Sequence, residues 1–289
     1  MKSHSQTAVF SAFLRGYYSK YFPHPMIHDE LSLEIIPKEI HDQILSRLLS
    51  GNSSSLDSQS FLQDALPNFP GFSQTILRTY LSEKYLLEEH YEQYVILGAG
   101  LDTSPLRYSA CPISFFEVDH PQTLSFKKSL ISHQNQSDIK TSYISTGIEG
   151  ALEALQKNQQ FNPNKKTLFT LQGLSMYLSK QTFIDFLLEL DQSPITPYGI
   201  FFDFFSDDIF ETPHKNTTIS TLFQLIEGSG EKLKSGYRKE EIQTLFDKIS
   251  NSSLTIIESS DIHQLLSKNK DSQLYPDDHV LYSYIKKIM

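Results

Sequence analysis

The chain has 289 residues, with 25 lysines and arginines against 34 aspartates and glutamates, and a formal net charge of −9 at pH 7. Its length allows one large α/β domain or two smaller ones, and a hydrophobic fraction of 39% is ordinary for a globular protein. The acidic balance and the lack of a long basic run argue against a nucleic-acid partner, because surfaces that bind nucleic acid concentrate positive charge.

Cysteine use and hydropathy point to the cytoplasm. Cys111 is the only cysteine, so the chain cannot form an internal disulfide. The N-terminal segment lacks the apolar core of a signal peptide, and no apolar run approaches the 18 residues of a membrane span. We therefore expect a cytoplasmic protein without a membrane segment.

Residues 1–90 are predicted to be mostly helical, with turns at 22–25, 51–55 and 66–71. From Tyr94 onward, short apolar runs alternate with segments of helical periodicity. The predicted strands are 94–100, 113–119, 141–146, 167–173 and 199–205, and the helices between them are 121–134, 147–160 and 179–192.

The last part of the chain departs from this alternation. Residues 206–236 are interpreted as a polar stretch and 237–249 as a further helix, while 253–262 and 279–288 are predicted to be closing strands with no helix between them. Alternating strands and helices indicate βαβ crossovers and a parallel sheet covered on both faces. We expect a Rossmann-like, seven-stranded, mostly parallel sheet whose last strand is antiparallel.

Two glycines, Gly98 and Gly100, close the first strand of this series. A ligand of a doubly wound sheet lies at the carboxyl ends of the central strands, where residues without a Cβ let it approach the backbone. Asp119 ends the second strand, and an acid about 20 residues after the glycines is expected to bind ribose hydroxyls. This spacing predicts a nucleoside site.

The residues that follow the glycines restrict the kind of nucleoside. A dinucleotide loop would have its third glycine at position 103, which is Thr103, and Asp102 is expected to face the cleft. The missing glycine and the acid both disfavour a pyrophosphate at a helix N-terminus. A cationic nucleoside without phosphate, S-adenosyl-L-methionine, fits better, and Asp102 is a candidate residue for binding it. An NAD(P)-dependent oxidoreductase shares the architecture and is an alternative.

Three segments resemble the leucine carboxyl methyltransferase family in content, order and spacing. They are VILGAGLDTSPLR at 95–107, FFEVDHPQTLSFKK at 115–128 and LQGLSMYLS at 171–179. The helical lead-in from residue 7 and RTYLSEKYL at 78–86 are also similar to that family, so the resemblance covers roughly 7–205. It implies a class I methyltransferase fold with a helical N-terminal lid, and an S-adenosylmethionine-dependent O-methyltransferase.

The resemblance also implies roles for individual residues. Gly98 and Gly100 would line the methionine part of the cofactor, Asp119 would bind the ribose, and Arg78 would pair with the cofactor carboxylate. In two places the chain departs from the family. Gln172 replaces a glutamate near the amino-acid end of the cofactor, and Thr146, or Ser145 beside it, replaces an aspartate that reaches toward adenine.

We expect residues 1–90 to form the lid, and 91–289 to form the methyltransferase core with 206–236 as an insertion over the site. A carboxylate acceptor is ionised at pH 7 and needs no general base, so a small-molecule or peptide-terminus carboxylate is the expected substrate. Tyr177 is the candidate catalytic residue where acceptor and methyl group meet; packing under the lid is an equally good account. A non-catalytic protein that keeps this fold is a further alternative, and the sequence leaves the oligomeric state open.

Several other features have weaker interpretations. Arg15, Tyr17 and Tyr21 could hold an acidic acceptor, although a structural role fits them better. His24, His28 and Asp29 have the spacing of a helix face, but the prolines at 22–25 break the helix, so no metal site is expected.

Overall fold

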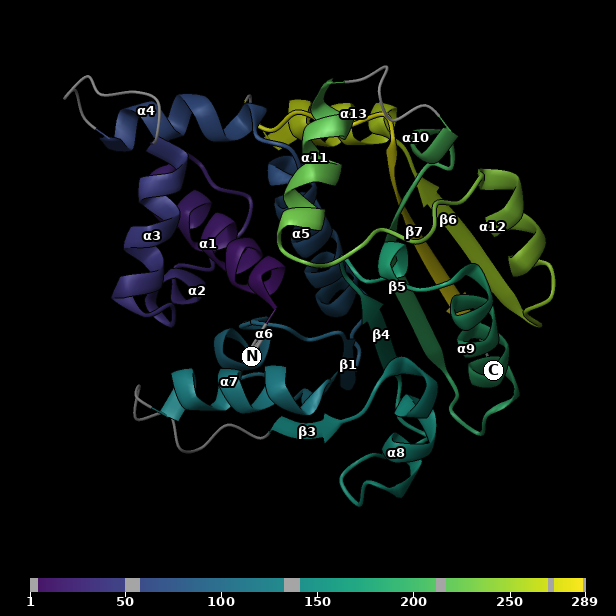
Figure 1. The fold of residues 1–289 in the computed structure, drawn as a ribbon. Helices are drawn as coiled ribbons and strands as arrows, with labels where there is room; N and C mark the ends of the chain where they lie inside the picture. Colours follow the sequence, from purple (N-terminus) through teal and green to yellow (C-terminus); the bar gives the residue numbers. More distant parts are fainter. Residues whose placement is uncertain (1–4, 50–57, 133–140, 212–216, 270–272, 288–289) are drawn as a thin grey trace.

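The structure is a computed structural model that describes residues 5–49, 58–132, 141–211, 217–269 and 273–287. A single seven-stranded sheet in the order β3-β2-β1-β4-β5-β7-β6 forms its centre (Figure 1). The strands are β1 (Gln93–Leu97), β2 (Ser114–Asp119), β3 (Thr141–Ser145), β4 (Thr167–Leu171), β5 (Tyr198–Phe205), β6 (Ser252–Ile257) and β7 (Val280–Lys287).

The strand pairing confirms the predicted sheet. The first five strands pair in parallel, and β7 pairs antiparallel with both β5 and β6. Every residue of β1, β4 and β5 is buried, as expected for central strands covered on both faces, and this is why they appear as continuous apolar runs. The parallel strands bring their carboxyl ends to one edge of the sheet, where the order reverses between β1 and β4.

Helices cover both faces of the sheet and contribute to two apolar clusters. One face is covered by α8 (Ala151–Lys157), α9 (Lys180–Gln192) and α12 (Lys239–Phe246). The other is covered chiefly by α5 (Phe72–Glu88), α7 (Pro121–Ser132) and α13 (Ser259–Asn269). Ser179 caps α9, since its side chain accepts a hydrogen bond from the Thr182 N–H.

The N-terminal residues are helical, as predicted, and group beside the sheet (Figure 1). The elements there are α1 (Gln6–Tyr21), α2 (Leu31–Glu34), α3 (Lys38–Leu49), α4 (Ser58–Ala65) and η1 (Leu66–Asn68). The short elements elsewhere are α6 (Ser104–Arg107), η2 (Ile148–Gly150), η3 (Ser175–Tyr177) and α10 (Asp208–Glu211). The predicted turn at 51–55 lies outside the described residues. No helix among the described residues is long and apolar enough to cross a bilayer.

A buried chain of charged side chains joins α1 to the core. Arg15 donates from Nε to Asp29 Oδ2 at 2.8 Å and from Nη2 to the Leu101 carbonyl at 2.8 Å. On the other side of Asp29, Arg107 Nε lies 3.1 Å from Oδ1, and Arg107 also pairs with Glu83 on α5. The Arg15–Asp29 pair therefore ties the N-terminal helix to the loop that follows β1.

Two predictions about the last part of the chain were wrong. The helix α13 lies between the closing strands, because Ile262 and Leu266 have helical spacing and are buried against the core. The Asp261 carboxylate also accepts from the Glu258 N–H, as a residue in the first turn of a helix does. Residues 206–236 are not simply polar, since they include the apolar helix α11 (Thr217–Gly228).

Candidate functional site

A cavity of about 1100 Å³ lies at the carboxyl ends of the central strands, between the loop after β1, the helices α1, α3 and α5, and α11. All but one of the site residues predicted from the sequence line it: Arg78, Gly98, Gly100, Asp102, Asp119, Gln172 and Tyr177. The exception is Thr146, which is not part of the cavity wall; its backbone N–H donates to the Asp119 carbonyl at 3.1 Å.

The glycine loop lies tightly under two neighbouring side chains. Gly98 and Gly100 both have left-handed backbone conformations, with φ of +69° and +49°. A Cβ on Gly98 would lie 3.1 Å from Leu174 Cδ1, and one on Gly100 would lie 3.0 Å from the Ala8 Cβ. A larger residue would be strained at either position and would reduce the space at the cavity floor.

The Asp119 carboxylate supports this loop. Its Oδ2 accepts from the Gly100 N–H at 2.8 Å, and its Oδ1 accepts from the His120 N–H at 2.6 Å. The side chain is only half-buried and lines the cavity. Since a carboxylate offers about four lone-pair positions, Asp119 can still accept hydrogen bonds from a ligand.

Asp102 gives the cavity a second negative charge. Its Oδ1 accepts from the Ser104 N–H at 2.7 Å. Burial disfavours the ionised form, but the cations Arg15 and Lys127, together with the Ser104 hydrogen bond, hold the pKa of Asp102 below its ordinary value. The carboxylate is therefore ionised at neutral pH and makes this part of the cavity unfavourable for phosphate.

The Arg78 guanidinium lies against Gly173, in the loop after β4. A Cβ on Gly173 would be 2.4 Å from Arg78 Nη1, so the guanidinium occupies the space that a side chain would need. Its hydrogen bonds are long, 3.4 Å to Asp203 Oδ2 and 3.4 Å to Ser11 Oγ. Because a guanidinium has five N–H donors, Arg78 can also bind a ligand carboxylate in the cavity.

Asp203 is a residue that the sequence analysis missed. It is fully buried at the end of β5, where its Oδ1 accepts from the Gly173 N–H at 2.6 Å and its Oδ2 from Gln74 Nε2 at 3.0 Å. It thereby holds both Gly173 and Arg78 in place. The signal was a lone acid in the aromatic run FFDFF, since a charge in a fully buried strand needs a partner.

Gln172 directly precedes Gly173 in the sequence and lines the cavity. Its Nε2 donates to the Tyr94 hydroxyl at 3.2 Å, which leaves Oε1 as an acceptor for a ligand amine. Burial raises the pKa of Tyr94, so its hydroxyl stays neutral. The pairing orients the amide of Gln172.

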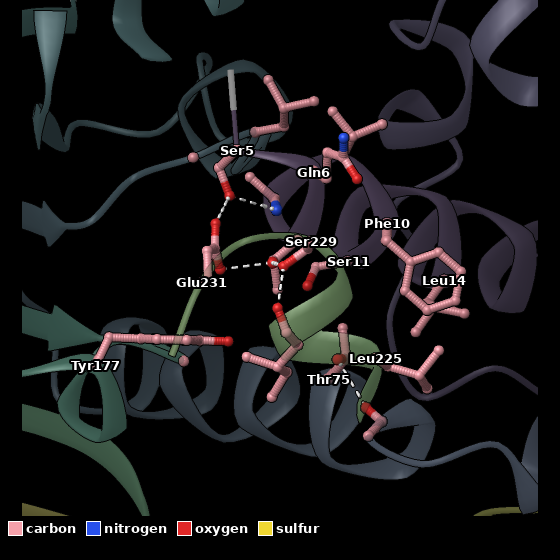
Figure 2. Close-up of a pocket in the computed structure, with 18 of the residues that line it drawn as sticks. Ser5, Gln6, Phe10, Ser11, Leu14, Thr75, Tyr177, Leu225, Ser229 and Glu231 are labelled. Carbon is pink, nitrogen blue, oxygen red and sulfur yellow. Dashed lines mark hydrogen bonds between the residues drawn. The ribbon is translucent and has the colours of Figure 1, made fainter. Parts of the chain in front are cut away.

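Tyr177 lines the cavity from η3. Burial, and after it the nearby carboxylate of Glu231, raise the pKa of the Tyr177 phenol, so the hydroxyl is a neutral hydrogen-bond donor at physiological pH. In Figure 2, Tyr177 lies on one side of the cavity and Phe10, Leu14 and Leu225 lie on the other.

Hydrogen bonds join the first turn of α1 to the segment after α11 (Figure 2). Ser5 Oγ donates to Glu231 Oε1 at 2.7 Å and Thr7 Oγ1 donates to Glu231 Oε2 at 2.6 Å. The Thr7 and Ser229 hydroxyls are 3.5 Å apart. Glu231 is thus held by two hydroxyl donors where the two segments meet.

The weaker predictions can also be placed in the structure. Arg15 lines the cavity, but its charge is paired with Asp29, while Tyr17 and Tyr21 are not part of the wall. Thr103, at the position of the third dinucleotide glycine, is buried and donates to Asp29. The helix after it, α6, has only four residues, in contrast to the long helix that a dinucleotide loop opens.

Comparison with known proteins gives consistent matches. A family model described as leucine carboxyl methyltransferase matches residues 8–190. YktD of Bacillus subtilis (strain 168), provisionally named an S-adenosyl-L-methionine-dependent methyltransferase, is 28% identical over 98% of each chain. A protein of Mycobacterium tuberculosis (strain ATCC 25177 / H37Ra) with a similar provisional name is 31% identical over 91 residues, which are 31% of this chain and 26% of that protein.

Among solved structures, the fold is similar to a crystal structure from Thermobifida fusca YX that is provisionally described as a methyltransferase. The TM-score is 0.53 at 16% sequence identity, and the match covers 85% of this chain and 94% of that chain. At this identity the likeness concerns the fold alone.

Proposed function

The chain belongs to the leucine carboxyl methyltransferase family and is an S-adenosylmethionine-dependent methyltransferase, and from this premise we propose that it methylates a carboxylate. The observation that supports the proposal is the protonation of Tyr177 and the hydrogen bonding of the nearby Glu231. The phenol is kept protonated by its raised pKa, and the nearby Glu231 carboxylate already accepts two hydrogen bonds. The protonated Tyr177 phenol is not suited to take a proton from a hydroxyl acceptor, and the Glu231 carboxylate is directed toward Ser5 and Thr7. A carboxylate acceptor has no proton to remove.

The residues around the cavity fit the cofactor. Gly98 and Gly100 provide a floor without side chains, and the half-buried Asp119 has acceptor positions for ribose hydroxyls. At the other end, Arg78 has donors for the cofactor carboxylate and Gln172 has Oε1 for its amine. We assign these five residues to the cofactor. The Thr146 assignment to adenine stays a prediction, since Thr146 is not part of the cavity wall.

The same residues argue against the two alternatives. For a dinucleotide, the ionised Asp102 repels phosphate, and Thr103 and the four-residue α6 replace the third glycine and its helix. If the protein were non-catalytic, the presence of Gln172 in place of the family's glutamate would have to abolish cofactor binding. The cavity nevertheless keeps an acceptor there, and Asp203 supplies a buried negative charge next to Arg78.

The chain's own residues act by binding, orienting and excluding water. When bound, S-adenosylmethionine supplies an electrophilic methyl group on a sulfonium. Tyr177 donates to the acceptor oxygen that does not attack, and so orients the other oxygen for in-line displacement. We propose that residues 1–90 and 206–236 act as the lid, since α1 and the segment after α11 meet over the cavity through Glu231. Positioning and exclusion of water can each contribute several kcal/mol.

The test is a transfer assay with tritium-labelled methyl groups on S-adenosylmethionine. The acceptors are carboxylic acids and matched alcohols, for example dodecanoic acid and dodecanol. A methyl ester releases volatile methanol in base, and an ether does not. We expect base-labile label with acids alone. Base-stable label, or transfer to the alcohol series only, would refute carboxylate methylation and leave the enzyme class intact.

A further inference from the structure

From the part of the cavity wall that α3 and α11 form, we propose that the acceptor is an elongated apolar carboxylic acid with an acyl-like chain. This substrate class rests on the proposed function, because it places the chain of the acid in the part of the cavity that the cofactor residues leave free. Pockets for drug-sized ligands measure about 300–1,000 Å³. The cavity, at about 1100 Å³, has room for the cofactor and a second molecule.

The first support is the apolar stripe of α3. Ile40, Ile44 and Leu48 are four residues apart, lie on one face of the helix and line the cavity. No residue of α3 is fully buried, and Ile40, Ile44 and Leu48 are only partly covered by their packing against the core. An amphipathic helix normally buries its apolar stripe, whereas part of this stripe stays open to the cavity.

The second support is α11, whose side chains face in different directions. Phe223 packs against Phe210 with ring centroids 5.5 Å apart, and Ile226 is buried in the core. Leu222 and Leu225 line the cavity, and the Leu225 side chain is 44% exposed. Only three large hydrophobic residues of the described ranges are exposed, Leu87, Leu225 and Tyr275, so an exposed leucine at the cavity wall is a distinctive feature.

The polar residues of the cavity are distributed unevenly. Arg78 and Asp119 belong to the part assigned to the cofactor, and Asp102 closely follows Gly100 in the loop after β1. Glu231, Lys232 and Lys234 border the cavity after the end of α11. On α3 and α11, the polar residues of the wall are Gln43, Arg47 and Gln224, all exposed to solvent. A peptide or a sugar would need hydrogen-bond partners along its length, whereas an acyl chain needs apolar contacts such as those of Phe10, Leu222 and Leu225.

The test measures binding of n-alkanoic acids from six to fourteen carbons by calorimetry, below their micelle concentrations and with S-adenosylhomocysteine present. Burial of each methylene should tighten binding about fourfold until the chain fills the cavity. The variant Leu225→Asp should weaken dodecanoate binding by about tenfold or more, because a charge then borders the chain. The matched control is Leu87→Asp, since Leu87 is a 41% exposed leucine that is not part of the cavity wall.

The outcomes separate the two proposals. The S-adenosylhomocysteine affinity is measured first, in each variant. If S-adenosylhomocysteine does not bind, the assignment of the cavity to the cofactor is wrong. If it binds with equal affinity in all variants, the series of alkanoic acids tests the substrate class alone. A flat dependence on chain length, equal effects of Leu225→Asp and Leu87→Asp, or tighter binding of a leucine-terminated peptide than of any alkanoate would overturn the acyl-chain inference.

Discussion

Replacing Gly173 with alanine tests whether Arg78 is positioned for the cofactor. Gly173 has φ of +62°, and an added Cβ would lie 2.4, 2.7 and 2.9 Å from Arg78 Nη1, Cζ and Nη2. An alanine in the left-handed region costs about 1–2 kcal/mol. The contact atoms belong to the end of a flexible side chain, so the guanidinium moves and the backbone stays. The loss should therefore appear mainly in cofactor binding.

The matched control is Gly71→Ala. Gly71 has φ of +82°, and its nearest neighbour to an added Cβ is Leu222 Cδ1 at 3.9 Å, so this variant has the backbone strain without displacing Arg78. Both variants should lower the melting temperature by a few degrees, at roughly 2–4 °C per kcal/mol for a chain of this size. Only Gly173→Ala should weaken S-adenosylhomocysteine, by about 10- to 150-fold, the equivalent of a charge-assisted hydrogen bond of about 1.5–3 kcal/mol.

Isothermal titration calorimetry with S-adenosylhomocysteine gives the affinity, and a thermal melt without ligand gives the stability. Equal affinities in Gly71→Ala and Gly173→Ala would refute the assignment of Arg78 to the cofactor carboxylate. A large additional loss of melting temperature in Gly173→Ala would show that the backbone, and not the guanidinium, absorbs the contact.

Three further variants test other contacts of the site. Asp119→Ala should weaken S-adenosylhomocysteine by about 10- to 100-fold in calorimetry, because a charged acceptor for ribose is lost. Asp203→Asn should lower the free energy of unfolding by about 3 kcal/mol in urea, because Arg78 loses its buried counter-charge. Burial raises the pKa of Glu117 from 4.5 to about 7 although Lys127 lies 2.5 Å away, so the native state holds this proton more tightly than the unfolded chain. Stability should therefore fall as the pH rises from 4.5 to 7, and the double variant Glu117→Gln/Lys127→Met should lack this part of the slope.

Each of these predictions has a contrary result. An unchanged affinity in Asp119→Ala would remove the ribose assignment. Wild-type stability in Asp203→Asn would mean that the buried negative charge is not needed, and that the single oxygen of an asparagine, which can accept from only one of the Gly173 and Gln74 donors, is sufficient. Parallel pH profiles of the wild type and the double variant would place the pH dependence in other groups.

The sheet and several of the residues that line the cavity could be predicted because they depend on local patterns. Central strands appear as apolar runs, and the glycines after β1 and the acid after β2 have a spacing set by one βαβ unit. The reversed last strand was also predicted correctly, although the reasoning was wrong: α13 does connect β6 to β7, and the antiparallel pairing holds nevertheless.

Long-range contacts account for what the sequence could not show. Arg78 meets Gly173 and Asp203 from three distant segments, and no periodicity in any one of them predicts that meeting. The apolar residues of α11 lie between polar residues in the sequence, so the segment 206–236 as a whole was interpreted as polar. Thr146 was predicted to be a site residue only from its position at the end of the third strand. Its backbone N–H donates to the Asp119 carbonyl, but Thr146 does not line the cavity.

The Arg15–Asp29 pair also sets a boundary for protein engineering. Arg15 on α1 pairs with Asp29, just before α2, and also donates to the Leu101 carbonyl in the loop after β1. These first elements are therefore fixed to the part of the structure that we assign to the nucleoside. The α3 helix, by contrast, has no fully buried residue. A chimera that exchanges α3 and α11 with a homologue, but retains everything up to Ile36, should therefore keep its cofactor affinity while acquiring a different acceptor. On the acyl-chain proposal, acceptor selectivity would change with these two helices while the rest of the chain stays the same.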